Sequence, residues 1–288
     1  MLICSVSAFS QLNDYYYSDR NLELYNPAIS TNGSILVSVY NKHRIRRLTY
    51  NASAIILGIS ADSSNFTGLL TYMGSYDPNY FKNFSFNGGL SYKFKNLSFG
   101  ANAGMIYSRV LYNQIVIDLS DPVEPSHVSD MALDINAGIQ YSSYLNNDKI
   151  NHLKVHISYN HLNTPTVFDN TYLVNESSFN PLLKTGVSFR HVVISKVLDV
   201  KFSYNGFYTN RSQHSLSFTD IYKEVLELGG GYCSNSAAFF RLGLNLNHLH
   251  IRLVYFTKFP VSTTNNFFVG KGFEENFLIY TGSDDFFN

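Results

Sequence analysis

The sequence predicts an all-β protein, a transmembrane up-and-down antiparallel β-barrel of about 14 strands. The first observation behind this prediction is the composition. Of the 288 residues, 45% are hydrophobic and only 15% are charged, and 22 Tyr and 23 Phe are present without any Trp. Soluble domains carry about 25% charged residues, and disordered chains are poor in aromatic residues. The best apolar run, Ala54 to Ile59, is far shorter than the ~18–20 residues of a membrane-spanning helix. Any membrane crossing is therefore expected to use strands.

The second observation is a period of two in hydrophobicity, which is typical of strands with one apolar and one polar face. In one run Leu133, Ile135 and Ala137 alternate with Asp134 and Asn136. Similar runs predict strands at 35–45, 50–60, 65–74, 83–95, 96–110, 131–144, 152–163, 181–195, 198–210, 213–221, 225–234, 236–247, 248–258 and 272–282. Many of these reach the ~9–11 residues that a tilted strand needs to cross a bilayer. The core of a soluble β-sandwich is the alternative explanation of the many aromatic residues.

The third observation is the order of the connections. Single-chain outer-membrane barrels have an even number of strands and carry their long loops on the outside. The four longest predicted connections are 75–82, 111–130, 164–180 and 259–271. They are the third, fifth, seventh and thirteenth, so a barrel that starts in the periplasm places all of them outside. Tight joins such as Lys95-Asn96 and Lys196-Val197 then lie at the opposite end.

The beginning of the chain predicts export. Residues 1–10 are interpreted as the remnant of a cleaved signal peptide, because they are apolar and Ala8-Phe9-Ser10 resembles a signal-peptidase site. An N-terminal tag without function and a lipid anchor on Cys4 are the alternatives. Residues 11–34 are expected to form a periplasmic segment with a rigid turn, because Pro27 fixes its own φ and disfavours helix at Asn26. Residues 35–288 are expected to form the barrel in the outer membrane.

The polar face of the predicted strands is expected to face the barrel interior. A Lys or Arg that faces lipid at mid-bilayer costs about 2–4 kcal/mol, and six cations of the predicted strands all lie on the polar face of their run: Lys154, Lys184, Arg190, Lys201, Arg241 and Arg252. The residues expected to line the interior are Asp134, Asn136, Lys154, His156, Lys184, Arg190, Lys201, Arg241 and Arg252.

No pattern of a catalytic, metal or cofactor site stands out, so neither an enzyme nor a cofactor is predicted. His248 and His250 share a strand face, but no further metal ligand accompanies them. The acids Asp118, Asp121, Glu124 and Asp130 could bind calcium, although a run of acids like this is more often a solvated loop. With 21 Lys+Arg against 21 Asp+Glu, no basic surface for nucleic acid is expected.

Several short segments resemble one known family. Leu24-Tyr25-Asn26-Pro27-Ala28 resembles the N-terminal Tyr-x-Asn-Pro-Ala signature of the PorP/SprF family of type IX secretion proteins in Bacteroidetes. The segments 96–100, 134–139, 158–162 and 272–277 resemble further strand motifs of the family in the right order. The segments 40–47 and 254–257 depart from the family pattern, so the chain resembles a divergent, SprF-like member.

The resemblance implies an outer-membrane barrel that binds the C-terminal domain of a large secreted surface protein, often a gliding adhesin, alongside other type IX secretion components. Aromatic residues in the predicted outer loops are the candidate partner-binding residues: Tyr76, Tyr112, Phe168, Tyr172, Phe179, Phe267 and Phe268. Such aromatics often anchor interfaces, but they could also fold back and plug the barrel. A porin or solute channel is the alternative function, and a barrel hydrolase is a weaker one.

Overall fold

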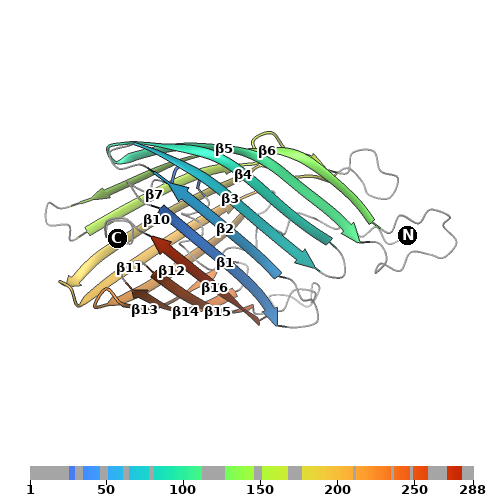
Figure 1. The fold of residues 1–288 in the computed structure, drawn as a ribbon. Coiled ribbons are helices and arrows are strands. Elements are labelled where there is room, and N and C mark those ends of the chain that lie inside the picture. The colour runs from blue at the N-terminus through green and yellow to red at the C-terminus, as the bar shows by residue number, and fades with distance from the viewer. Residues whose placement is uncertain are drawn as a thin grey trace.

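A computed structural model describes residues 26–29, 35–45, 51–60, 65–77, 81–111, 127–145, 151–167, 177–209, 212–234, 237–246, 249–258 and 271–280. Within these residues, 14 strands form one closed antiparallel barrel, in which β1 pairs with β16 (Figure 1). The barrel strands are β1 (Ile35–Ile45), β2 (Asn51–Ile59), β3 (Phe66–Asp77), β4 (Phe81–Phe94), β5 (Leu97–Leu111), β6 (His127–Tyr144), β7 (Asn151–Asn160), β10 (Leu182–Ile194), β11 (Leu198–Tyr208), β12 (Ser212–Tyr222), β13 (Leu226–Cys233), β14 (Ala237–Leu246), β15 (Leu249–Lys258) and β16 (Lys271–Tyr280).

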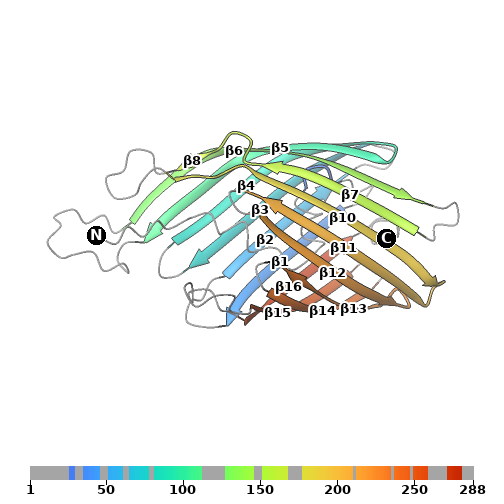
Figure 2. The ribbon, with the colours of Figure 1, turned by 180° about the vertical axis from the view of Figure 1, so that it is seen from behind.

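The predicted fold class is confirmed. Each of the 14 predicted ranges coincides with one barrel strand to within four residues at either end. Every barrel strand is hydrogen-bonded to the barrel strands before and after it, which gives the up-and-down order seen from both sides (Figures 1 and 2). No helix in the described part of the chain is long and apolar enough to cross a membrane.

The two ends of the barrel differ. At one end, here called the short-turn end, two or three residues join β4 to β5, β10 to β11, β12 to β13 and β14 to β15. Three of these turns contain non-glycine residues in the left-handed region, Lys95, Lys196, Lys223 and Glu224, at φ values of 50–58°. The opposite end, here called the long-loop end, has the connections 112–126, 161–181 and 259–270. The predicted long loop at 75–82 is wrong, because β3 and β4 pair up to Asp77 and Phe81 and leave only residues 78–80 between them.

The barrel wall is apolar outside and polar inside. Large apolar side chains stay exposed on the outer face, such as Leu216 at 62% and Leu90 at 61%. Neighbouring residues on the inner face are buried and polar, among them Asn87, Asn136 and Ser217. Because an exposed apolar surface of this extent is unfavourable in water, the outer face is suited to the hydrocarbon of a bilayer.

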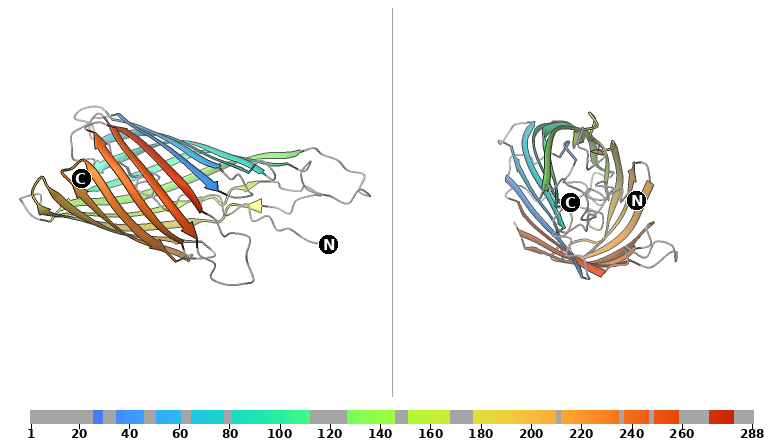
Figure 3. Two further views of the ribbon diagram at one scale, coloured as in Figure 1. Left: turned by 90° about the horizontal axis from the view of Figure 1, so that it is seen from below. Right: turned by 90° about the vertical axis from the view of Figure 1, so that its right-hand side faces the viewer.

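Two further segments of the described chain are not part of the barrel wall but contact it. A small hairpin of β8 (Thr166–Val167) and β9 (Ser177–Ser178) follows β7 at the long-loop end (Figure 2). The turn Asn26–Ile29 packs against inner-wall residues of β5 and β6 near the short-turn end. An end-on view shows the closed ring of strands (Figure 3). The sequence predicted this turn but not its place at the inner wall.

Candidate functional site

The structure places the nine predicted interior residues on the inner face of the wall. Asp134, Asn136, His156, Lys184, Arg241 and Arg252 are buried. Lys154, Arg190 and Lys201 are half-buried. In the ladders, Lys154 is opposite the buried Ser188, and Arg190 is opposite both the buried His152 and Lys201. Directly opposite residues of an antiparallel ladder point to the same face. The interior therefore carries charges of both signs, held by strands on several sides of the barrel.

One polar cluster lies where β7 ends. The His161 Nδ1 atom is 2.7 Å from Asp134 Oδ1, and the Asn136 side chain donates a hydrogen bond to Asp134 Oδ2 at 2.9 Å. The Asn136 Oδ1 atom accepts a hydrogen bond from the His161 backbone N–H at 3.0 Å. His161 adopts a left-handed φ of 59°, which turns the chain away from the β7 ladder. The buried Lys184 ammonium is attracted by the Asp134 carboxylate. These contacts end the β7 ladder at the long-loop end of the barrel.

A second cluster lies near the short-turn end around Glu227, on β13. The Arg252 guanidinium contacts Glu227 Oε2 through Nη2 at 2.5 Å and Nε at 3.2 Å. His250 Nε2 is 3.3 Å from Glu227 Oε1, and Asn245 donates to the same oxygen at 3.3 Å. On the neighbouring wall, Arg190 forms an ion pair with Asp199. Glu227 was not among the predicted interior residues, although its place between Leu226 and Leu228 put it on the polar face.

The candidate partner-binding residues fall into three groups. Phe179 is buried, not exposed, and its ring lies 5.5 Å from the His161 ring between centroids. It packs with Val167 and the inward-facing Ile106. The Phe179 side chain is therefore not an exposed anchor in this structure. Tyr76 lies in β3, opposite Asn51 and Lys82, because the β3–β4 ladder is longer than predicted. The others, Tyr112, Phe168, Tyr172, Phe267 and Phe268, lie outside the described residues.

A Ser–His contact in the described part of the interior joins Ser142 and His152. The Ser142 hydroxyl is 2.9 Å from His152 Nε2, which satisfies the first geometric condition for an activated serine. Both residues face the inside of the barrel near the short-turn end, and His152 packs against Tyr144. The acyl chains of the membrane meet the opposite face of the wall, so this contact does not suit a lipid hydrolase. Among the described residues no group of three His, Cys, Asp or Glu could hold a metal ion, and Asp118, Asp121 and Glu124 lie outside them.

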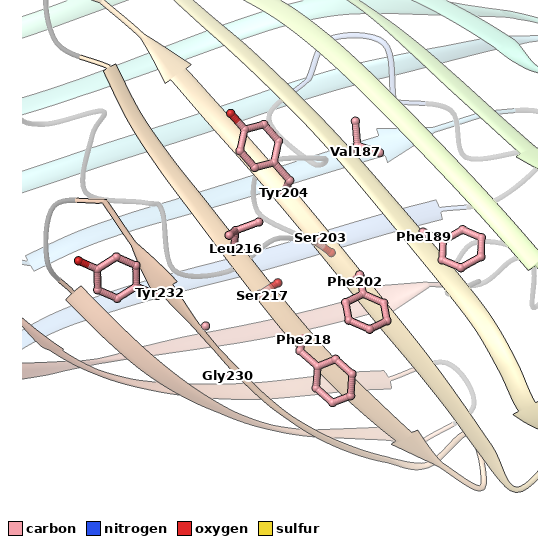
Figure 4. Close-up of a pocket in the computed structure, with 11 residues that line it drawn as sticks. Val187, Phe189, Phe202, Ser203, Tyr204, Leu216, Ser217, Phe218, Gly230 and Tyr232 are labelled. Carbon is pink, nitrogen blue, oxygen red and sulfur yellow. The ribbon is translucent and has the colours of Figure 1, made fainter.

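The outer wall has an apolar groove on β10 to β13 (Figure 4). It has a volume of about 540 Å³ and is lined by Phe189, Phe202, Leu216, Phe218 and Tyr232, with Gly230 supplying no side chain. At its long-loop edge the Tyr204 hydroxyl is 2.8 Å from His214 Nδ1. Tyr204 thus lies where the apolar outer surface gives way to polar groups. Aromatic residues at such a boundary are typical of the girdle at the membrane–water interface of a barrel.

Comparison with known proteins agrees with this geometry. A family model described as type IX secretion system membrane protein PorP/SprF matches residues 7–274. Among curated proteins, none matches the chain. The solved structure of the monoaromatic hydrocarbon channel CymD is 11% identical with a TM-score of 0.52, covering 91% of this chain and 92% of that chain. The toluene transporter TodX of Pseudomonas putida is 11% identical with a TM-score of 0.46, covering 92% and 93%. At this identity the similarity to CymD shows the barrel fold alone.

Proposed function

The chain belongs to the PorP/SprF family of type IX secretion system membrane proteins, and we propose that within this system it retains a secreted protein at the cell surface. The partner is the C-terminal domain of a large surface protein such as an adhesin, including adhesins used in gliding. Family membership implies association with other secretion components. The barrel lies in the outer membrane and reaches it by means of the signal peptide proposed at residues 1–10. The function is binding, without turnover of a small molecule.

The observation that supports this proposal is the difference between the two ends of the barrel. The connections 112–126, 161–181 and 259–270 all lie at the long-loop end, whereas the short-turn end has several turns of two or three residues. A stable protein complex buries about 1,200–2,000 Å², which short turns cannot offer. The long-loop end is therefore the surface on which a secreted domain can dock.

The described part of this end is already folded. The β8–β9 hairpin is fixed by Phe179 and Val167 on Ile106, and the Phe179 backbone N–H donates to the Pro165 carbonyl at 2.9 Å. A docking surface that is ordered before binding loses less conformational entropy when the partner arrives. We propose that Phe168 and Tyr172, between the two hairpin strands, make the contacts with the partner.

Purification of the full-length protein from its native membrane tests the proposal. A secreted protein with its C-terminal domain should co-purify in near-equal amount. The Phe168→Ala and Tyr172→Ala variants should lose that partner, whereas Phe240→Ala, which alters the lipid-facing wall, should retain it. A barrel that carries no such partner and conducts solutes in a planar bilayer would support the channel alternative, and release of fatty acid from lipid would support the hydrolase alternative.

A further inference from the structure

The turn Asn26–Ile29 closes on itself. The Asn26 side-chain oxygen accepts a hydrogen bond from the Ala28 backbone N–H at 2.9 Å. The Ile29 backbone N–H donates to the Asn26 carbonyl at 3.1 Å. The remaining Asn26 side-chain donor reaches the wall, where it binds the Ile139 carbonyl of β6 at 3.2 Å. The Asn26 side chain can make two of these three hydrogen bonds because it carries both a donor and an acceptor on a short side chain, and the third uses the backbone carbonyl.

The wall has a niche that fits this turn. Gly100 of β5 and Gly138 of β6 are directly opposite each other in the ladder, so their missing side chains leave one shared gap on the inner face. A Cβ atom at Gly100 would overlap the Pro27 carbonyl, and one at Gly138 would overlap the Asn26 side-chain oxygen. Glycine is thus required at both positions for the turn to approach the strands so closely.

The turn is covered on all sides. A turn that lay against the wall of an open, water-filled interior would keep its far side exposed. Instead Asn26, Pro27, Ala28 and Ile29 are all buried, with Ala28 at 0% exposure. Gly100 lies only three residues from the start of β5, so the turn sits close to the short-turn end. The ion pairs Arg190–Asp199 and Glu227–Arg252 lie near the same end on other strands.

We propose that Asn26–Ile29 is an internal plug, held in the Gly100–Gly138 niche, that closes the barrel at its short-turn end. Side chains alone fill barrels of about 8 strands, whereas barrels of about 16–18 strands leave an aqueous channel. A barrel of 14 strands lies between these limits, so an additional segment in its interior decides whether solutes pass. With the plug in place, the barrel interior does not conduct solutes, so the protein is not an open pore. This inference goes beyond partner retention and does not depend on it.

The plug can be displaced by filling its niche. In the full-length protein, Gly100→Ala and Gly138→Ala should expel the turn, and Asn26→Ala should weaken it without changing the wall. A reporter cysteine, Ile29→Cys in a background in which Cys4 and Cys233 are both replaced by Ser, should be unreactive toward a polar maleimide in the otherwise native barrel, because Ile29 is buried. It should become reactive in both glycine variants. The same variants should gain discrete conductance steps in planar bilayers, which the native barrel should lack.

Matched controls separate plug release from damage to the wall. Gly68→Ala and Gly88→Ala add the same methyl group where the nearest atoms lie at ordinary distances of 3.7 and 3.5 Å, so they should leave the reporter unreactive and the barrel closed. Heat-modifiable gel mobility should show a folded barrel in every variant that is compared. Equal reactivity of the reporter in all folded variants would overturn the proposal. Release of the reporter without any gain of conductance would equally overturn it, since the turn would then not be what closes the barrel.

Discussion

At the scale of single residues, neighbours in a strand meet opposite surroundings. In β7, Ile157 is 48% exposed on the outer face, and Ser158, the next residue, is 1% exposed on the inner face. The alternation follows from strand geometry, in which successive side chains point to opposite sides. Its consequence is that the effect of a charge depends on parity and on depth in the membrane.

A charge at Ile157 should be costly. The Ile157→Arg variant should lose about 2–4 kcal/mol of unfolding free energy in lipid vesicles, because the guanidinium would face hydrocarbon near the middle of the wall. The control variant is Ile194→Arg, because Ile194 is exposed and lies next to the β10–β11 turn. It should lose only about 0–1 kcal/mol of unfolding free energy. Urea titration followed by gel mobility measures both. Equal losses at the two positions would contradict the depth assignment.

Removal of the Glu227 charge should also be costly. The Glu227→Gln variant keeps the side-chain shape but leaves the buried Arg252 guanidinium without its carboxylate, which typically costs about 3–5 kcal/mol. The exposed Glu224→Gln, in the turn before the same strand, should change stability by less than about 0.5 kcal/mol. Thermal unfolding of the refolded barrels compares them. A small effect at Glu227 would mean that water already compensates the ion pair.

At the scale of elements, β7 is shorter than the strands beside it. It has 10 residues, whereas β6 has 18 and β10 has 13. The β8–β9 hairpin lies beyond the end of β7 at the long-loop end of the barrel. There it packs against β6, which extends further than β7. Buried apolar contacts, rather than ladder hydrogen bonds, hold this hairpin, since β8 and β9 have two residues each.

Truncation of Phe179 should therefore open the hairpin without opening the barrel. The Phe179→Ala variant removes a buried aromatic side chain, which costs about 3–5 kcal/mol where it is well packed. We expect faster proteolysis within 161–181, measured by mass spectrometry of the fragments, and an unchanged heat-modifiable band. The lipid-exposed Phe240→Ala should leave the cleavage rate of 161–181 unchanged. If Phe179→Ala were cleaved no faster, the hairpin would be held by other contacts.

At the scale of the whole molecule, closure removes every edge of the sheet. β1 and β16 pair over ten residues, from Leu36–Tyr280 to Ile45–Lys271. In hydrocarbon no water is present to bind free backbone groups, so only a closed barrel satisfies all strands. The pairing of β16 with β1 is thus as important to assembly as any other pairing in the barrel.

A proline in the closing strand should prevent assembly. Leu278 is buried on the inner face and pairs with Ser38 on one side and His250 on the other. Leu278→Pro removes a ladder donor from a strand that is paired on both sides, which proline does not tolerate. We expect loss of the heat-modifiable band on refolding into vesicles, with Leu278→Val folding normally. A folded Leu278→Pro barrel would show that closure does not depend on this part of the β1–β16 ladder.

The sequence by itself determined the number of strands, the side on which they are polar and the end that carries most long connections. These properties follow from the period of two and from turn residues, both of which are local to each strand. Only the tertiary structure decided which residues meet in the interior. The Glu227–Arg252 ion pair, the burial of Phe179 on His161 and the niche for Asn26 all join residues that are distant in sequence. Such contacts depend on the register of neighbouring strands and on the closure of the ring. Neither property can be predicted from the hydrophobic alternation within a single strand.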